Sequence, residues 1–315
     1  AQTAQPVPKG KPAPALPDDM RSHFNVSPQQ HFSGRVAFTS NAYGANRVFV
    51  FDIATKRIAP FIADYGDNTH PAWSPDGSKL AFASNRFGNY DIFIINWDGT
   101  GLTRLTEHPA DEGDPVWYPD GSTLFFYRNG TTPRQSNLFS IGLGTRKVYS
   151  VTDFTQGRNT TPAVSPDGSR VAYSTNRFWP GWDVCLWNIP ASVETCILKG
   201  TSSYSRPAWS KDGSKILYST GGGTEIDVGV YTTKSKEKEF ITALKGREYD
   251  ATYISEDIIL FAAEPEGRGQ FHLYYIKGED TPKPLLKGKF GMRYISWNEK
   301  TALQLEVERI KSQSQ

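Results

Sequence analysis

Short apolar runs recur along the chain, and a similar polar turn precedes each of the clearest ones. Residues 78–84 read SKLAFAS, and the text PAWSPDG stands directly before them. The counterparts of this run are STLFFYR, SRVAYST and SKILYST. Because these runs are apolar at successive positions rather than at alternate ones, they predict strands that are covered on both faces. Asp and Gly in the preceding turn favour a tight reversal between antiparallel strands.

Each of these predicted strands is followed by two more. The next apolar run reads DIFIIN at residues 91–96, with the counterparts NLFSI, DVCLWN, DVGVY and HLYYI. A polar turn such as DGTG then leads to a short run such as LTRLT. With Pro-Ala-Trp as the first strand, each unit therefore predicts four short strands.

The unit repeats with a nearly constant length. The residue after each Pro-Ala pair, or its equivalent, marks the repeat, and successive marks lie 44 to 47 residues apart. The marks are Trp73, Trp117, Val164, Trp209, Tyr253 and Trp297. A four-stranded propeller blade has this length. Because a catalytic motif would be needed only once, we interpret the repeated SPDG text as a hairpin and blade-packing signal.

The two ends of the chain supply the parts of one further blade. Residues 34–52 align with a second and a third strand and lack a first, which MRYISWN at residues 292–298 can provide. We therefore expect an all-β, six-bladed β-propeller over residues 34–298, closed by pairing of the C-terminal strand with the N-terminal blade, since an open ring would expose sheet edges. In residues 299–315, TALQLEVERI resembles another second strand, so an edge strand, a tail and a seventh blade are alternatives there.

Composition narrows the classes of function. The 315-residue chain has a formal net charge of +2 and no basic stripe, so we expect no nucleic-acid partner. No apolar run reaches the roughly 18 residues of a membrane helix, so we do not expect the chain to span a membrane. Residues 1–33 begin with an Ala-, Gln- and Pro-rich stretch and predict a flexible segment. The start AQTAQ is typical of a mature end left by signal cleavage, or of a trimmed chain.

The two cysteines, Cys185 and Cys196, flank a predicted hairpin with Pro190 and Ala191 at its turn. In that register they face each other across two strands. A disulfide there fits an oxidising compartment, and two buried free thiols are the alternative.

The repeated text resembles a known family. PAWSPDGSKLAFASNR followed by DIF is similar to the WD40-like (PD40) repeats of the TolB β-propeller family, and the resemblance covers roughly residues 34–298. It implies a periplasmic or secreted protein of the cell envelope, because TolB is periplasmic and binds the peptidoglycan-associated lipoprotein on its propeller. TolB carries an α/β domain before its propeller, whereas only 33 residues precede the first predicted strand here. We therefore expect a TolB-like relative without that domain.

The loops before the first strands are expected to meet at one mouth of the central channel. The residue before each Pro-equivalent differs from blade to blade, while the strand pattern repeats. A purely structural role would require similar residues at this position in every blade. Recognition of a specific ligand would instead require different ones. The expected binding residues are His70, Asp114, Thr161, Arg206, Asp250 and Tyr294, with Tyr249 and Arg293 beside them.

Aromatic residues in two longer loops form a second candidate surface. They are Phe87 and Tyr90 in NRFGNYD, and Phe178, Trp179 and Trp182 in NRFWPGWD. Exposed rings can anchor a partner protein or stack on a sugar ring. The alternative is that they fold down over neighbouring strands.

The chain offers little that points to catalysis. It contains neither a G-x-S-x-G elbow nor an H-E-x-x-H motif, and we assign no catalytic residue, cofactor or metal. A divalent cation at the mouth is an alternative, but the arginines there argue against a purely cationic guest. The leading hypothesis is a binding scaffold for a cell-envelope protein, peptide or polymer, such as a peptidoglycan-associated lipoprotein-like partner. A metal-assisted lyase or lactonase using His70, Asp114 and Asp250, and a carbohydrate-binding module, are the rivals.

Overall fold

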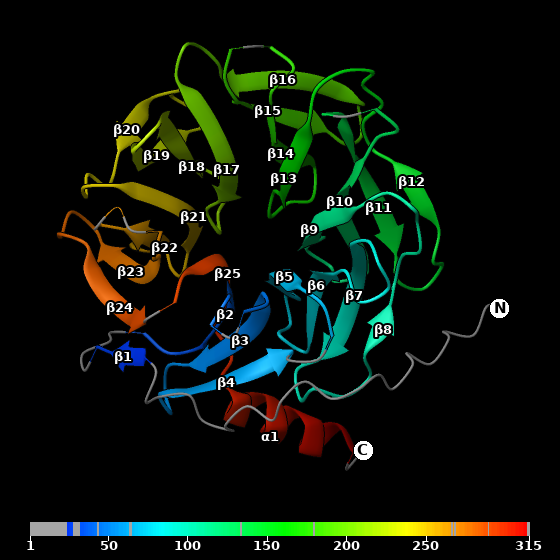
Figure 1. Ribbon diagram of the computed structural model, residues 1–315, viewed down its shortest axis with the longest axis vertical. Helices are drawn as coiled ribbons and strands as arrows, with labels where there is room; N and C mark the ends of the chain where they lie inside the picture. The colour runs from blue at the N-terminus through cyan, green and yellow to red at the C-terminus, as the bar shows by residue number, and fades with distance from the viewer. Residues whose placement is uncertain are drawn as a thin grey trace.

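The computed structural model is built almost entirely of antiparallel strands arranged around a central axis (Figure 1). It describes residues 24–27, 32–42, 44–62, 65–132, 134–178, 180–265, 267, 269–288 and 290–313. Within each unit, the first strand lies nearest the axis, and the second, third and fourth strands follow toward the outside (Figure 1). In the described part of the chain, no helix is long and apolar enough to cross a membrane.

The strands fall into four classes by their order in the unit. The first strands are β5 (Asn68–Trp73), β9 (Glu112–Trp117), β13 (Asn159–Val164), β17 (Ser203–Trp209), β21 (Arg247–Tyr253) and β25 (Met292–Asn298). The second strands are β2 (Arg35–Ser40), β6 (Lys79–Ser84), β10 (Thr123–Asn129), β14 (Arg170–Thr175), β18 (Lys215–Gly222) and β22 (Ile258–Glu264). The third strands are β3 (Arg47–Asp52), β7 (Asp91–Asn96), β11 (Ser136–Gly142), β15 (Asp183–Asn188), β19 (Glu225–Thr232) and β23 (His272–Lys277). The fourth strands are β4 (Arg57–Ile62), β8 (Thr103–Arg104), β12 (Val148–Ser150), β16 (Val193–Leu198), β20 (Lys238–Phe240) and β24 (Lys283–Gly288).

Together with the short strand β1 (Phe24–Val26), these strands form four four-stranded sheets and one nine-stranded sheet. The nine-stranded sheet joins β17–β20 to β21–β24 through one parallel pair, Ile226 with Arg247. The second strands are buried on both faces, as their apolar sequences predict, and clusters of apolar side chains fill the spaces between adjacent sheets. The all-β architecture expected from the sequence is thus present.

The SPDG text forms the turn between first and second strands. At the first copy, the Asp76 carboxylate accepts hydrogen bonds from the Ser74 hydroxyl at 2.6 Å and from the Ser78 backbone N–H at 3.0 Å. Gly77 has φ +72°, which favours glycine. The same serine–aspartate bond recurs at Asp167 and Asp212, so the repeated text is used for local structure.

The two ends of the sheet region lie side by side. Strand β25 pairs antiparallel with β2, with Val36 opposite Trp297 and Arg35 opposite Asn298. Gly34 has φ +135°, and a Cβ atom there would lie 2.4 Å from the Trp297 ring, so the close approach requires glycine. The sheet β25-β2-β3-β4 therefore joins the last strand of the chain to β2, the first of the second strands.

Part of the expected N-terminal flexible segment is ordered. Phe24–Val26 forms β1, which pairs with the outer edge of β24, so the expectation is wrong for these residues. Phe24 is buried and contacts the rings of Phe38 and Phe49 edge-on. One buried aromatic ring and the unpaired edge of β24 hold this short segment. Residues 1–23 and 28–31 lie outside the described residues.

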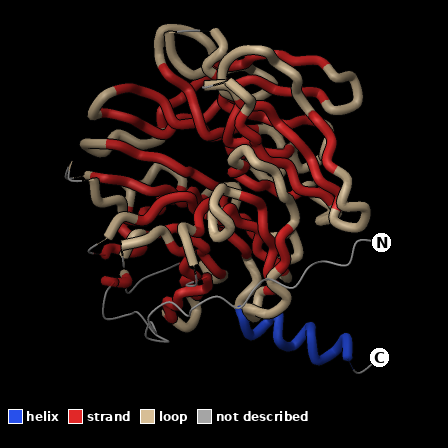
Figure 2. The backbone as a smooth tube through the Cα atoms, turned by 45° about the vertical axis from the view of Figure 1, so that its right-hand side comes forward, coloured by secondary structure: helices blue, strands red, loops and turns tan. Residues whose placement is uncertain are grey.

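The segment after Trp297 is helical, which corrects the expected edge strand or seventh-blade strand. Ala302–Gln313 forms α1, at the outside of the molecule near the C-terminus (Figure 2). Thr301 and Gln304 form a capping box, in which the Gln304 backbone N–H donates to the Thr301 hydroxyl and the Thr301 N–H donates to the Gln304 side chain. Leu305 is buried, whereas Leu303 and Val307 are exposed. The capping box thus favours a helix in a segment whose alternating apolar residues had predicted a strand.

Candidate ligand site at the channel mouth

The six residues expected at the mouth share one unusual backbone conformation. His70, Asp114, Thr161, Arg206, Asp250 and Tyr294 have φ values between +48° and +58°. Each lies in a β-bulge, where two residues of the first strand oppose one of the second. The opposing residue is a buried aromatic in every case: Phe38, Phe82, Phe126, Tyr173, Tyr218 or Phe261. Because the bulge recurs in every unit, it belongs to the scaffold.

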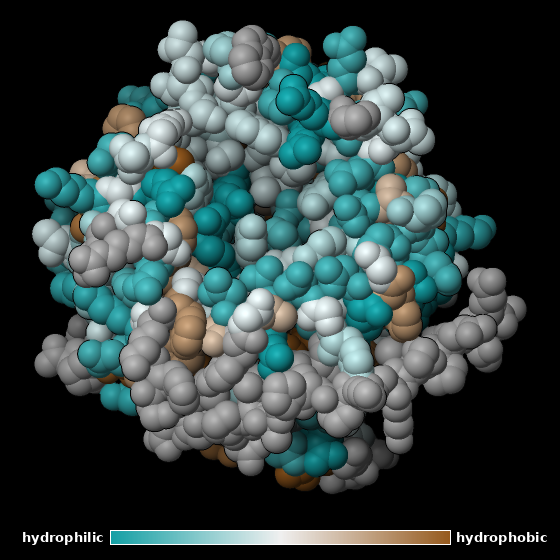
Figure 3. All heavy atoms as spheres, in the orientation of Figure 1, coloured by the Kyte–Doolittle hydropathy of each residue, from teal (hydrophilic) through white to brown (hydrophobic). Residues whose placement is uncertain are grey.

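The six bulges line one cavity on the axis. Its volume is about 220 Å³, and its wall consists of the six bulge residues and the two residues after each. Figure 3 shows a central hollow bordered mainly by hydrophilic residues. The fold thus gives all six positions the same geometry, while the side chains differ from one to the next.

On one side of the axis, His70, Asp114 and Thr161 form a chain of contacts. His70 Nε2 lies 2.8 Å from Asp114 Oδ1, and the Thr161 backbone N–H donates to Asp114 Oδ2 at 3.0 Å. Burial alone would raise the pKa of Asp114, but His70 and Arg206 outweigh it and lower that pKa below its ordinary value. The His70 ring lies 3.8 Å from the Tyr294 ring, and its Nδ1 is buried without a hydrogen-bond partner among the described residues.

On the other side, one carboxylate holds two guanidinium groups. Arg206 Nη1 donates to Asp250 Oδ1 at 2.6 Å, and Arg293 Nε donates to Asp250 Oδ2 at 2.8 Å. The backbone N–H of Tyr294 also donates to Oδ2. Burial opposes ionisation of Asp250, but the two arginines dominate and hold its pKa far below the ordinary value. Asp250 is therefore a charged anchor beside three first strands.

The donors considered for a metal do not gather at one point. Asp114 contacts His70, and Asp250 pairs with Arg206 and Arg293. Within the described ranges, three potential metal ligands converge only at Cys185, Glu194 and Cys196, where both sulfur atoms belong to a disulfide. The two aspartates of the mouth therefore have separate protein partners.

A second cavity adjoins the first and was not expected from the sequence. Its volume is about 390 Å³, and it contains Arg206, Arg293, Tyr249 and Tyr294 together with residues that we did not predict. The additional ones include Arg247, Thr160, Ser205 and Ser219. Arg247 lies three residues before its bulge, as Asp67 and Asp111 do before theirs. The difference in charge between these equivalent positions is the signal that could have indicated Arg247.

The loop aromatics have different surroundings. Phe87 stacks on Phe93 and lies under the Arg104 guanidinium, while Phe178 lies between Arg177 and Lys199. Cations therefore cover part of both rings. Tyr90 is half-buried, and burial together with Asp67 and Asp111 raises its pKa to about 12. Trp182 lines the second cavity, and Trp179 lies outside the described residues.

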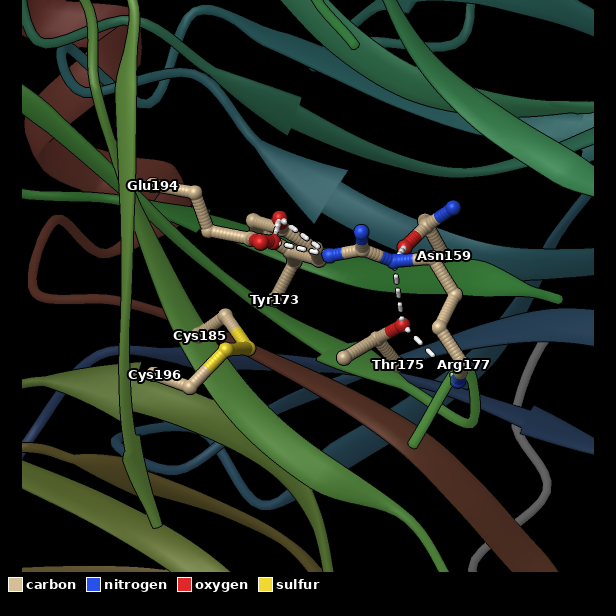
Figure 4. The surroundings of a disulfide bond; sticks show 7 residues. All are labelled: Asn159, Tyr173, Thr175, Arg177, Cys185, Glu194 and Cys196. Atoms are coloured by element: carbon tan, nitrogen blue, oxygen red, sulfur yellow. Dashed lines mark hydrogen bonds and ion pairs between the residues drawn. A yellow bond between two sulfur atoms is a disulfide. The ribbon is translucent and has the colours of Figure 1, made fainter. Parts of the chain in front are cut away.

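The two cysteines are joined by a disulfide across the hairpin of β15 and β16 (Figure 4). Beside it, the Glu194 carboxylate accepts hydrogen bonds from the Tyr173 hydroxyl and from Arg177. Arg177 also lies 3.4 Å from the centre of the Phe154 ring. The covalent link and this ion pair both fasten the outer strand β16 to the inner strands of its sheet.

Comparisons with known proteins agree with this fold. Residues 21–177 match the model of the TolB beta propeller domain, PD40. TolB from Acinetobacter baumannii has a TM-score of 0.72 and 18% sequence identity, over 86% of this chain and 68% of that chain. A putative TolB from Agrobacterium tumefaciens has a TM-score of 0.65 and 16% identity, over 84% of this chain and 99% of that chain. The molecule is a β-propeller protein. It belongs to the TolB-like PD40 propeller family.

An enzyme has a similar fold. An oligogalacturonate lyase in complex with manganese matches with a TM-score of 0.57 and 16% identity, over 81% of this chain and 75% of that chain. No curated protein sequence matches the chain significantly. Because these structural identities are low, the structural matches establish the fold and leave the activity to be argued from the site.

Proposed function

We propose that the protein is a periplasmic or secreted binding scaffold, built as a closed six-bladed ring, that engages a cell-envelope protein, peptide or polymer at its channel mouth. Four of the blades are the four-stranded sheets, and the other two are β17–β20 and β21–β24 of the nine-stranded sheet. The β2–β25 pair closes the ring. A peptidoglycan-associated lipoprotein-like protein is the partner that the family suggests.

One observation carries this proposal. Six equivalent residues have the same backbone conformation and line one cavity, yet their side chains are His, Asp, Thr, Arg, Asp and Tyr. A scaffold needs the shared bulge but not this variety of side chains, whereas recognition of an asymmetric ligand does.

The test is affinity capture from a native cell envelope with wild-type protein and with Arg206→Gln. The proposal expects a partner that co-purifies with the wild type and is depleted with the variant, while both proteins show the same circular dichroism. Arg146→Gln, on an exposed turn, is the matched control. Equal recovery with all three proteins would contradict a binding site at the mouth.

The enzyme hypothesis remains the second candidate because the fold is shared with a manganese-containing lyase. It requires a divalent cation at His70, Asp114 or Asp250, and therefore displacement of their present ion-pair partners. Calorimetric titration with Mn²⁺ discriminates the two, since tight binding that is lost in Asp114→Asn would favour the enzyme. The carbohydrate-binding hypothesis has less support, because cations lie against Phe87 and Phe178.

A further inference from the structure

The second cavity, which we call the arginine pocket, is rich in hydrogen-bond donors. Its lining includes Arg206, Arg247 and Arg293. Seven Ser and Thr residues also line it: Thr160, Thr161, Ser174, Ser203, Ser205, Ser219 and Thr220. Arginine and hydroxyl donors at this density favour an acceptor ligand.

The carboxylates around the arginine pocket leave part of its donor capacity unused. Arg206 and Arg293 share the carboxylate of Asp250, and Arg206 also lies within the influence of Asp114. Arg247 pairs with the buried carboxylate of Glu264, with Nη2 at 2.6 Å from Oε2. Each guanidinium group carries five N–H donors, so these carboxylates do not use all of them.

Two sets of donor atoms are left for a ligand. Among the described residues, Arg293 bonds to Asp250 through Nε, and its two terminal Nη atoms have no hydrogen-bond partner. Ser219 is 1% exposed, lines the pocket, and its hydroxyl has no hydrogen-bond partner in the described part of the chain. Its counterpart in the neighbouring sheet, Ser174, bonds both Thr161 Oγ1 and the Arg206 backbone N–H. An unsatisfied buried hydroxyl and a free guanidinium edge in the lining of one cavity offer donors to an acceptor ligand.

We propose that the arginine pocket binds a single carboxylate from an acidic side chain of a partner polypeptide, held by the Arg293 Nη atoms and the Ser219 hydroxyl. This inference rests on the proposed function and specifies the chemistry of the partner. A carboxylate is an anionic acceptor that matches the planar guanidinium edge, and it can accept from a hydroxyl at the same time. A peptide is favoured over an acidic glycan because Phe87 and Phe178, the loop rings suited to stacking on sugars, are already covered by cations.

The test uses immobilised full-length protein and pools of short acetylated peptide amides. The pools have random flanking residues and either Glu or Gln at one central position, and mass spectrometry measures how much of each is retained. We expect the wild type to retain the Glu pool about tenfold better, the ratio that one charge-assisted hydrogen bond supports. Arg293→Gln should bring that ratio close to one, and Arg146→Gln should leave it unchanged.

Ser219→Ala provides an independent variant, because removing a hydroxyl that has no protein partner should not disturb folding. It should lower the Glu preference by about threefold to tenfold, because the hydroxyl donates a hydrogen bond that is stronger to a carboxylate than to the neutral amide of Gln. Equal retention of the two pools by the wild type overturns the inference, as does a preference that survives both variants. Retention of oligogalacturonate in place of the peptides also overturns it.

The affinity capture from the cell envelope distinguishes an error in the carboxylate inference from an error in the proposed scaffold function. If a partner still depends on Arg206 but no Glu preference is found, the carboxylate inference is wrong and the scaffold proposal stands. If neither the partner nor the peptides depend on the mouth residues, both are wrong.

Discussion

Arg293 Nε donates to Asp250 Oδ2 at 2.8 Å, and this bond joins β25, near the end of the chain, to β21 of the preceding unit. The other oxygen of Asp250 accepts from Arg206 of β17. One buried carboxylate therefore connects three neighbouring units at the axis. Asp250 therefore stabilises the fold and also positions Arg206 and Arg293, both of which line the arginine pocket.

Replacement of Asp250 by Ala should destabilise the fold by about 3–5 kcal/mol, because two partly buried guanidinium groups lose their counter-charge. Urea unfolding followed by tryptophan fluorescence measures the change. Asp98→Ala, in an exposed turn, is the control and should cost much less. A loss of under about 1 kcal/mol in Asp250→Ala would show that the pairs are no stronger than surface ion pairs.

The buried Glu248 should make stability depend on pH. Burial raises its pKa from 4.5 to about 7, although Thr242 and the Leu244 backbone N–H donate to it. Between these two pH values the folded state holds more protons than the unfolded state, so stability falls as pH rises. The predicted decrease is about 3 kcal/mol across that window.

Glu248→Gln should flatten this dependence, since the amide keeps one acceptor and one donor without a charge. The measurement is the free energy of unfolding from acidic to neutral pH. Glu239→Gln, on the exposed strand β20, removes the same charge from the surface. If the wild-type slope persisted in Glu248→Gln, another group would be responsible.

The disulfide should contribute through chain entropy. Cys185 and Cys196 are separated by 11 positions, and closure of a loop of this size is worth about 3 kcal/mol in the chain-entropy model. The double variant Cys185→Ala/Cys196→Ala should therefore unfold at lower urea concentration. Adding a reductant should weaken the wild type and leave the double variant unchanged. Equal stability of the two proteins in oxidising buffer would contradict this.

Gly34 tests the junction between the two ends of the strand region. An alanine Cβ at this position would clash with Trp297, so Gly34→Ala should cost at least about 2 kcal/mol. Gly200→Ala is a matched control, because its φ is +146° but a Cβ there meets nothing within 4 Å. Any excess loss in Gly34→Ala then reports the clash alone. Equal losses in the two variants would mean that the β2–β25 contact adapts easily.

Much of the fold could be predicted because it depends on local and periodic signals. The SPDG turns and the apolar runs before Asn85, Asn129 and Asn176 specify hairpins without reference to distant residues. The bulge positions also follow from the repeat, because in four of the six units the next residue is a proline, which lacks the N–H that a strand would pair. Counting back from each Pro-equivalent therefore identified residues that line one cavity.

What could not be predicted depends on contacts between distant parts of the chain. The ordering of Phe24 requires the edge of β24, which lies at the other end of the sequence. The helix after Thr301 had a local signal, the capping box with Gln304, which the alternating apolar pattern obscured. The arginine pocket needs Arg206, Arg247 and Ser219 to come together from adjacent strands, and no spacing in the sequence encodes their distance.

The central claim is that a partner binds at the channel mouth. Hydrogen–deuterium exchange of the protein with and without its captured envelope partner tests this most directly. We expect protection to concentrate in β17, β21 and β25, each of which contributes an arginine to the arginine pocket. Protection confined to the outer strands β4, β8, β12 and β16, with none at the first strands, would contradict it.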